Sequence, residues 1–225
     1  MTNEEKFTNR KIVLSGDGSH TLLLPILNET YHSRHGAITE SLYVFIEKGL
    51  HANTSKSIKI FEVGFGTGLN AWLSLNEANG KKIQYYSIEA FPLERKEFEA
   101  INYSRLKEYP LGDVNYLKLH ESPWSEKVRV NDSFELYKIH SKLENFIPKT
   151  HDFDLIYYDA YGPSYQSEMW QEQHFKKMYD MLIVGGKLVS YCCSGVFKRA
   201  LKASGFSIEK LPGPPGKREM IVATK

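Results

Sequence analysis

The sequence predicts an α/β domain built on a mostly parallel sheet that helices cover on both faces. Short apolar runs alternate with helix-like segments from residue 58 onward, and this alternation is typical of parallel sheets with crossover helices. Phe153–Asp159 is nearly continuously apolar, as expected for a strand that is buried on both faces. A glycine-rich turn over Gly64–Gly68 stands where a strand becomes a helix. With 225 residues, the chain can form one such domain with a substantial core.

The expected elements follow from hydrophobic period and turn residues. Strands are expected at Ile58–Val63, Gln84–Ala90, Phe134–His140, Phe153–Asp159 and Lys187–Cys193. Helices are expected at Leu69–Ala78, Pro92–Asn102 (with proline in its first turn), Glu168–Leu182 (closed by Gly185-Gly186) and Val196–Ala203. A closing antiparallel hairpin is expected from Phe206–Leu211 and Met220–Thr224. Residues 110–133 are expected to form a loop. Residues 1–57 break the alternation, so we expect an N-terminal extension packed on the core, followed by the main domain over residues 58–225.

Composition excludes several classes of protein. Hydrophobic residues make up 41% and charged residues 25%, which is ordinary for a soluble globular chain. The sequence has no apolar stretch long enough to cross a membrane, and its polar N-terminus lacks the apolar segment of a signal peptide. Cys192 and Cys193 are adjacent and can supply neither a disulfide framework nor a zinc site. We expect a cytoplasmic protein with no membrane partner and no metal.

The positive charges gather near the C-terminus. Residues 187–225 carry eight lysines and arginines against two glutamates, a net charge of +6, while the other 186 residues sum to −4. A basic surface of this kind is compatible with a polyanionic partner. A solvated helix face followed by a charged tail is an equally good interpretation of the charge alone.

The turn between the first strand and helix of the main domain holds Gly64, Gly66 and Gly68. Glycines there let the backbone approach a ligand closely, and a helix N-terminus favours negative charge. The third glycine comes one residue earlier than in the dinucleotide-binding fingerprint. The G-x-G-x-G spacing resembles motif I of class I methyltransferases, whose loop curls around the amino-acid part of S-adenosylmethionine. The alternative is a tight turn that binds nothing.

Two acidic residues stand at the ends of two expected strands. Glu89 lies 21 residues after Gly68, where a carboxylate can accept both ribose hydroxyls of a nucleoside. Asp159 ends the most apolar strand and is expected to point at the reaction centre, because ligands of α/β sheets bind at the carboxyl ends of strands. A carboxylate there can orient an amine and stabilise developing positive charge, and Tyr161 could stack on a base. The alternatives are a solvated carboxylate and a simple turn.

Nearly the whole chain resembles the methyltransferase domain of the MnmC-type enzymes that make 5-methylaminomethyl-uridine in bacterial tRNA. The segments that carry the resemblance are Asp17-Gly18-Ser19, Tyr31-His32-Ser33 with Gly36 and Glu40, Glu62–Asn70, Glu89–Leu93, Asp159–Pro163 with Met169-Trp170, Ser194-Gly195-Val196 with Arg199, and Gly216–Met220. The glycine loop is shared by many methyltransferases, whereas its combination with the Phe-Pro-Leu and Lys-Arg-Glu-Met segments is specific to this family.

The resemblance implies a class I S-adenosylmethionine-dependent methyltransferase of Rossmann-like fold. It implies N-methylation of the 5-aminomethyl group of the tRNA wobble uridine. Cofactor binding would involve Gly64, Gly66, Gly68 and Glu89, Asp159 and Tyr161 would lie in the catalytic site, and Glu40 and Tyr31 would lie near the methionine end of the cofactor. We expect the anticodon region of tRNA as partner, with RNA contacts from Lys198, Arg199, Lys202, Lys217 and Arg218.

Two departures from the family qualify this expectation. Longer members carry a flavin-dependent oxidoreductase domain after the methyltransferase, whereas this sequence stops at Lys225. We therefore expect methyl transfer alone, with a separate oxidoreductase or another enzyme installing the aminomethyl group. The family also often has Gly-Asp at the end of the third strand, facing the adenine amine, and here the matching pair is Ile139-His140.

Two other functions stay open. An aminopropyltransferase shares this fold, but it needs extra acidic residues to hold a polyamine, and Ala160-Tyr161-Gly162 supplies none. Another small-molecule methyltransferase would share the cofactor site. A non-catalytic RNA-binding module would have little reason to keep the glycine loop together with Glu89 and Asp159.

Overall fold

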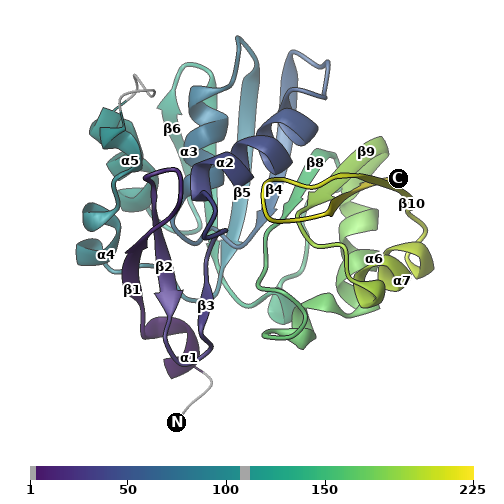
Figure 1. The fold of residues 1–225 in the computed structure, drawn as a ribbon. Helices are drawn as coiled ribbons and strands as arrows, with labels where there is room; N and C mark the ends of the chain where they lie inside the picture. The colour runs from purple at the N-terminus through teal and green to yellow at the C-terminus, as the bar shows by residue number, and fades with distance from the viewer. Residues whose placement is uncertain (1–3, 107–111) are drawn as a thin grey trace.

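The computed structural model describes residues 4–106 and 112–225 (Figure 1). Within these residues, an eight-stranded sheet has the strand order β10-β11-β9-β8-β4-β5-β7-β6. The five inner strands from β9 to β7 are parallel, and β6, β10 and β11 run antiparallel to their neighbours. The predicted fold class, including the C-terminal antiparallel hairpin, is confirmed. The strands are β4 (Ser57–Val63), β5 (Lys82–Glu89), β6 (Lys127–Asn131), β7 (Phe134–His140), β8 (Phe153–Tyr158), β9 (Leu182–Ser190), β10 (Ser207–Pro212) and β11 (Glu219–Thr224).

Two hydrophobic cores lie on the two faces of this sheet, because successive side chains of a strand point to opposite faces. In β8, Leu155 and Tyr157 join one core, whereas Ile156 and Tyr158 join the other. Helices on both sides complete these cores (Figure 1). The helices are α3 (Leu69–Asn76), α4 (Arg95–Ala100), α5 (Gly112–Glu121), α6 (Glu172–Met181) and α7 (Gly195–Ala203).

The N-terminal segment forms a small three-stranded antiparallel sheet followed by a helical stretch that reaches the main sheet. Its elements are α1 (Glu5–Thr8), β1 (Lys11–Leu14), β2 (His20–Leu24), β3 (Glu29–Thr30), α2 (Ala37–Ser41) and the π-helical η1 (Leu42–Leu50). Phe45 of η1 is buried against Tyr157 of β8, with ring centroids 5.1 Å apart. The domain boundary after residue 57 stays a prediction.

The loop predicted over residues 110–133 is wrong where the structure describes this stretch, since α5 and β6 lie in it. Residues 110 and 111 lie outside the described residues. In β6, half-buried Val128 and buried Val130 alternate with exposed charged residues, and the strand pairs with β7. This alternation is typical of a strand with one buried face, and a turn at Asp132-Ser133 joins it directly to the predicted strand β7, so the local sequence did carry a hairpin signal.

Three predicted boundaries also need correction. The helix predicted from Pro92 begins only at Arg95, because Glu94 and Glu97 form a capping box there. The helix predicted over Glu168–Leu182 is divided at Gln171, whose extended backbone separates the 3-10 turn η4 (Ser167–Trp170) from α6. Gly185-Gly186 does not close that helix, since both glycines lie inside β9, where the pairing register with β8 shifts.

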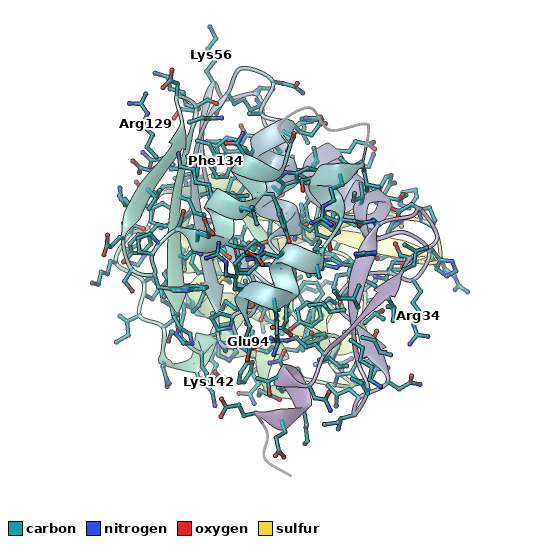
Figure 2. The ribbon with its side chains drawn as sticks, turned by 90° about the vertical axis from the view of Figure 1, so that its left-hand side faces the viewer. Arg34, Lys56, Glu94, Arg129, Phe134 and Lys142 are labelled. Carbon is teal, nitrogen blue, oxygen red and sulfur yellow. The ribbon has the colours of Figure 1, made fainter. Side chains whose placement is uncertain are left out.

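The parallel strands bring their carboxyl ends to one end of the molecule. Figure 2 shows Lys56, directly before β4, at the opposite end from Glu94 and Lys142, which follow β5 and β7. Ligands of open α/β sheets bind outside the carboxyl ends of the strands. Among the described residues, no helix is long and apolar enough to cross a membrane.

Candidate active site

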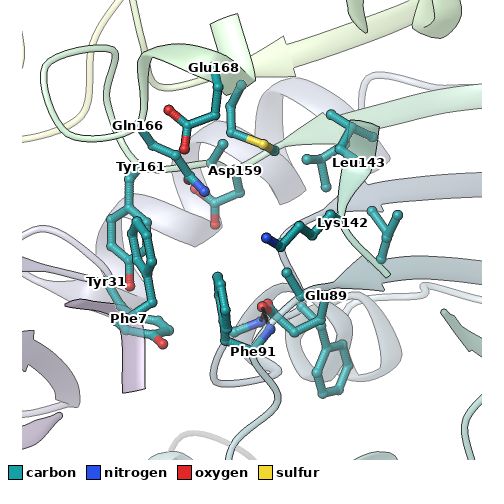
Figure 3. Close-up of a pocket in the computed structure, with 18 of the residues that line it drawn as sticks. Phe7, Tyr31, Glu89, Phe91, Lys142, Leu143, Asp159, Tyr161, Gln166 and Glu168 are labelled. Carbon is teal, nitrogen blue, oxygen red and sulfur yellow. Dashed lines mark hydrogen bonds between the residues drawn. The ribbon is translucent and has the colours of Figure 1, made fainter. Parts of the chain in front are cut away.

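A cavity of about 670 Å³ opens at the carboxyl ends of β4, β5, β7 and β8 (Figure 3). Its volume lies within the range of about 300–1,000 Å³ that is usual for small-molecule sites. Among the predicted site residues, Gly64, Gly66, Glu89, Asp159 and Tyr161 line it, and the N-terminal segment adds Tyr31. The structure therefore brings together side chains separated by up to 130 positions in the sequence.

The glycine loop approaches its neighbours so closely that side chains would not fit. Gly64 has a φ of +94°, and a Cβ there would lie 2.9 Å from the carbonyl oxygen of Asp159. Gly66 has a φ of +50°, and its Cβ would lie 3.2 Å from the ring of Tyr31. Both positions thus favour glycine for their positive φ, and Gly64 also requires it for space, because its neighbour is backbone. Gly68 differs from these two glycines in its surroundings: it is the N-cap residue of α3 and lies against His120.

Glu89 connects the end of β5 to the glycine loop. One carboxylate oxygen accepts a hydrogen bond from the Gly66 amide at 2.9 Å, and the other accepts one from the Phe91 amide at 2.8 Å. A carboxylate has about four acceptor sites, so both oxygens can still accept further hydrogen bonds. Glu89 is therefore fixed in orientation and able to receive hydroxyl donors from a ligand in the cavity.

Asp159 follows β8 and is held by the first turn of α3. The Asn70 amide donates a hydrogen bond of 2.8 Å to its carboxylate. Burial, together with the nearby Glu40 carboxylate, raises the pKa of Asp159 to about 7, against the lowering effects of the Asn70 hydrogen bond and the Lys217 ammonium. A carboxylate with a pKa near neutrality can hold or release a proton under working conditions.

Glu40 of α2 is buried and held from two sides. Its carboxylate accepts a hydrogen bond of 3.0 Å from the Ser33 amide and forms an ion pair with Lys217. Lys217 lies in the turn between β10 and β11, and its ammonium stands 3.8 Å from the centroid of the Tyr191 ring. Lys217, which the sequence placed among the RNA contacts, thus has partners within the protein.

Aromatic rings form one wall of the cavity (Figure 3). The rings of Tyr31 and Tyr161 meet edge to face, with centroids 5.3 Å apart. Phe7 of α1 stacks on Phe91 with centroids 5.2 Å apart and also contacts Tyr161 at 5.7 Å. Arg10 stabilises this wall. Its guanidinium lies 5.9 Å from the centroid of the Tyr31 ring and donates a hydrogen bond of 2.9 Å to the Glu97 carboxylate. A planar ligand group can stack against this wall.

The other predicted RNA contacts lie away from these rings. Lys198, Arg199 and Lys202 are carried by α7, whose opposite face is buried in the core, and Arg218 lies beside Lys217 in the hairpin turn. Arg199, Lys202 and Arg218 are exposed, whereas Lys198 is half-buried. All four side chains belong to residues 187–225, which we call the basic segment. Their binding to RNA stays a prediction.

Several lining residues were not singled out from the sequence. Asn70 stands in the first turn of the helix after the glycine loop, a position from which its contact with Asp159 could have been suspected. Phe7 gave no signal, because α1 is a helix of four residues far from the motifs. At the end of β7, the cavity is lined by Ser141, Lys142 and Leu143, which follow the Ile139-His140 pair. Figure 3 shows the amino group of Lys142 pointing into the cavity.

Comparison with known proteins gives a family and several relatives. A family model described as S-adenosyl-L-methionine-dependent methyltransferase matches residues 97–225. The chain is 30% identical over 225 residues to the "tRNA 5-methylaminomethyl-2-thiouridine biosynthesis bifunctional protein MnmC" of Cupriavidus metallidurans, covering 94% of this chain and 33% of that protein. The MnmC of Nitrosospira multiformis is 27% identical, with 86% and 33% covered. The chain thus spans about a third of the length of these relatives.

Solved structures show the same fold. MNMC2 from Aquifex aeolicus superposes with a TM-score of 0.78 at 23% identity, covering 100% of this chain and 77% of that one. DesVI from Streptomyces venezuelae superposes with a TM-score of 0.51 at 11% identity, covering 83% of this chain and 91% of that one.

Proposed function

Since the chain belongs to the S-adenosyl-L-methionine-dependent methyltransferase family that includes the MnmC methyltransferase domain, we propose that it methylates the 5-aminomethyl group of the tRNA wobble uridine. The product would be 5-methylaminomethyl-uridine or its 2-thio form. The names of the MnmC relatives support this substrate. The observation that carries the proposal is the Asp159 carboxylate, held by Asn70 in a cavity with an aromatic wall.

The residues of the cavity fit S-adenosylmethionine. Gly64 and Gly66 line the cavity with backbone alone, so the amino-acid part of the cofactor can approach the loop closely. Glu89 presents fixed acceptors for the ribose hydroxyls. Asp159 offers a negative charge to the sulfonium side of the site. We assign Gly64, Gly66 and Glu89 to direct cofactor contact.

Three other predicted cofactor residues would support that site without contacting the cofactor directly: Gly68, Glu40 and Tyr31. Gly68 shapes the helix start from behind the glycine loop. Glu40, which acts on Asp159 electrostatically, and Tyr31, whose ring packs on Gly66, would stand near the methionine end.

The bound cofactor supplies an electrophilic methyl group on sulfur. The acceptor amine must present its lone pair in line with this group, and the Asp159 carboxylate can orient the amine by accepting its N–H. As the new C–N bond forms and the C–S bond breaks, the nitrogen becomes positive, and the negative carboxylate stabilises it. With a pKa of about 7, Asp159 can then take the surplus proton and pass it to water.

The aromatic wall suits the rest of the acceptor. The Tyr161 ring, directly after the Asp159-Ala160 pair, would stack on the uracil base once it has left the anticodon stack. Phe7 and Phe91 extend the same surface and exclude water from the reacting groups. The half-buried and exposed cations of α7 would contact phosphates of the anticodon arm. Another active site, such as a separate oxidoreductase, would install the aminomethyl group beforehand.

The test is methyl transfer by the purified chain. The protein is incubated with S-adenosylmethionine and with tRNA that carries either 5-aminomethyl-uridine or 5-carboxymethylaminomethyl-uridine, and the nucleosides are analysed by mass spectrometry. We expect conversion of the aminomethyl form only. Methylation of the carboxymethylaminomethyl form by the chain alone would sink the substrate assignment. Transfer from decarboxylated S-adenosylmethionine to a polyamine would instead indicate an aminopropyltransferase.

A further inference from the structure

Lys217 turns away from solvent and toward the site. Its side chain is 30% exposed, and its ammonium pairs with the Glu40 carboxylate, whose side chain is 7% exposed. The same ammonium lies 3.8 Å from the centroid of the Tyr191 ring. The Tyr191 hydroxyl in turn donates a hydrogen bond of 2.8 Å to the carbonyl of Ala160, the residue after Asp159. Lys217 is thus connected to the Asp159 segment in two ways: through the Tyr191 hydrogen bond and through Glu40, which acts on Asp159 electrostatically.

The backbone holds this lysine in place. Gly216 has a φ of +85° and approaches His35 so closely that a Cβ would lie 2.2 Å from the imidazole. Four residues earlier, the Pro212 carbonyl accepts a hydrogen bond of 3.0 Å from the Tyr43 hydroxyl. The hairpin turn therefore lies against the N-terminal segment that carries Glu40, and a long cationic side chain from this turn reaches inward.

Charges of both signs act on Asp159. Glu40 raises its pKa and Lys217 lowers it. Glu62 at the end of β4, fully buried, also interacts with it electrostatically. The tyrosines Tyr85, Tyr103 and Tyr191, which are buried or half-buried, interact with Asp159 as well. Among these named groups Lys217 is the cation, so its removal would take away a positive charge that acts on Asp159.

We propose that Lys217 is a positioning residue of the methyl-transfer site: its ammonium holds the Glu40 carboxylate and the Tyr191 ring beside the segment that carries Asp159. This role differs from the RNA contact that the basic segment suggested. An RNA contact must offer its charge to a phosphate, whereas Lys217 already neutralises a buried carboxylate. The inference rests on the proposed reaction at Asp159, and its test includes a measurement that does not need tRNA.

The first measurement follows Asp159 directly. Aspartate carboxyl carbons are labelled with ¹³C, and the titration of Asp159 is recorded by NMR in the wild type, Lys217→Met and Lys217→Arg. We expect Lys217→Met to raise the midpoint by about one pH unit, an ordinary effect of losing one nearby opposite charge, and Lys217→Arg to restore it. An unchanged midpoint in Lys217→Met would overturn the inference. A wild type that titrates as expected but methylates nothing would refute only the proposed function.

The second measurement separates positioning from RNA binding. If the midpoint rises from about 7 to about 8, the ionised fraction at pH 7 falls from about one half to about one tenth, so turnover should fall about fivefold. The KM for tRNA and its salt dependence should not change. A higher KM with a salt slope reduced by about one, and unchanged turnover, would identify a phosphate contact and overturn the inference. Lys176→Met is the matched control, since it breaks an exposed lysine–aspartate pair with Asp180 on α6.

A further variant guards against loss of folding. Lys217→Met leaves the Glu40 carboxylate buried without its cation, which can destabilise the protein. The double variant Glu40→Gln with Lys217→Met removes both charges. We expect it to unfold at nearly the wild-type temperature and to bring the Asp159 midpoint down to the wild-type value or below it, because the raising influence of Glu40, which exceeds the lowering influence of Lys217, is lost as well. A midpoint in the double variant as high as in Lys217→Met would refute the link through Glu40.

Discussion

The Glu89 carboxylate accepts a hydrogen bond of 2.9 Å from the backbone amide of Gly66, so the residue that ends β5 also fixes the loop that follows β4. Two parts of the proposed cofactor site are therefore set by one side chain. A carboxylate bonded to a backbone N–H is a charge-assisted acceptor, which is stronger than a neutral one. The loop and the ribose acceptor should consequently fail together when Glu89 is changed.

We expect Glu89→Ala to weaken S-adenosylmethionine binding by about 1.5–3 kcal/mol, the scale for lost hydrogen bonds to a charged group. This loss corresponds to about 10- to 150-fold in the dissociation constant, measured by calorimetry. Glu135→Ala is the control, because Glu135 of β7 forms an ion pair with Lys127 of the edge strand β6. An affinity equal to that of the wild type would remove Glu89 from the site.

Asp159→Ala should separate catalysis from cofactor binding. If the carboxylate acts mainly on the acceptor amine, turnover should fall about 100-fold or more while the affinity for S-adenosylmethionine stays within a few fold. Turnover and calorimetry on the same preparation check this. Asp152→Ala serves as control, since Asp152 precedes β8 and binds Lys59 at the opposite end of the strand. Equal losses of turnover and affinity would contradict an acceptor role.

The ionised Asp159 carboxylate should lower the free energy of unfolding. Its pKa is about 7 in the folded protein and about 3.8 when unperturbed, so the folded state binds this proton more tightly than the unfolded state. Stability is therefore lost as pH rises from about 4 to about 7, and it stays lower above that. We expect Asp159→Asn to unfold about 2–10 °C above the wild type at pH 8, from a gain on the order of 1–3 kcal/mol. The two proteins should converge near pH 4. A difference independent of pH would refute this linkage.

The sequence predicted what local patterns encode and missed what distant contacts decide. The glycine loop, Glu89 and Asp159 end strongly apolar strands, and their convergence follows from parallel pairing. By contrast, Phe7 lines the cavity although it lies far from the motifs in the sequence, in an N-terminal segment that Arg10 ties to Glu97. The position of Lys217 depends on a hairpin turn packed against α2, so its charge alone suggested a surface role.

The cations of the basic segment should supply electrostatic binding to tRNA. Each lysine or arginine that neutralises a phosphate adds a slope of about one to the dependence of log affinity on log salt concentration. The variant that tests this combines alanine at Lys198, Arg199, Lys202 and Arg218. A control replaces four exposed cations on or next to β4, β5 and β6, namely Lys56, Lys82, Lys127 and Arg129. We expect weaker binding and a slope shallower by up to about four in the first variant only. An unchanged slope there would place the RNA surface elsewhere.

The rate of methyl transfer should depend on two protons. The attacking amine must be neutral, and alkylamines resemble lysine, with a reference pKa of about 10.4 that the electron-poor uracil lowers. Asp159 must be ionised to orient the amine, and its pKa is about 7. Single-turnover rates should therefore rise steeply below about pH 7, then more gently until the amine has lost its proton. In Asp159→Asn the steep limb should disappear while the gentle limb persists at a lower rate, because only the amine still titrates. Rapid-quench measurements at saturating cofactor between about pH 6 and 9 check both limbs. A wild-type rate that does not change over this range would mean that the bound amine is already neutral and that Asp159 does not titrate during the reaction.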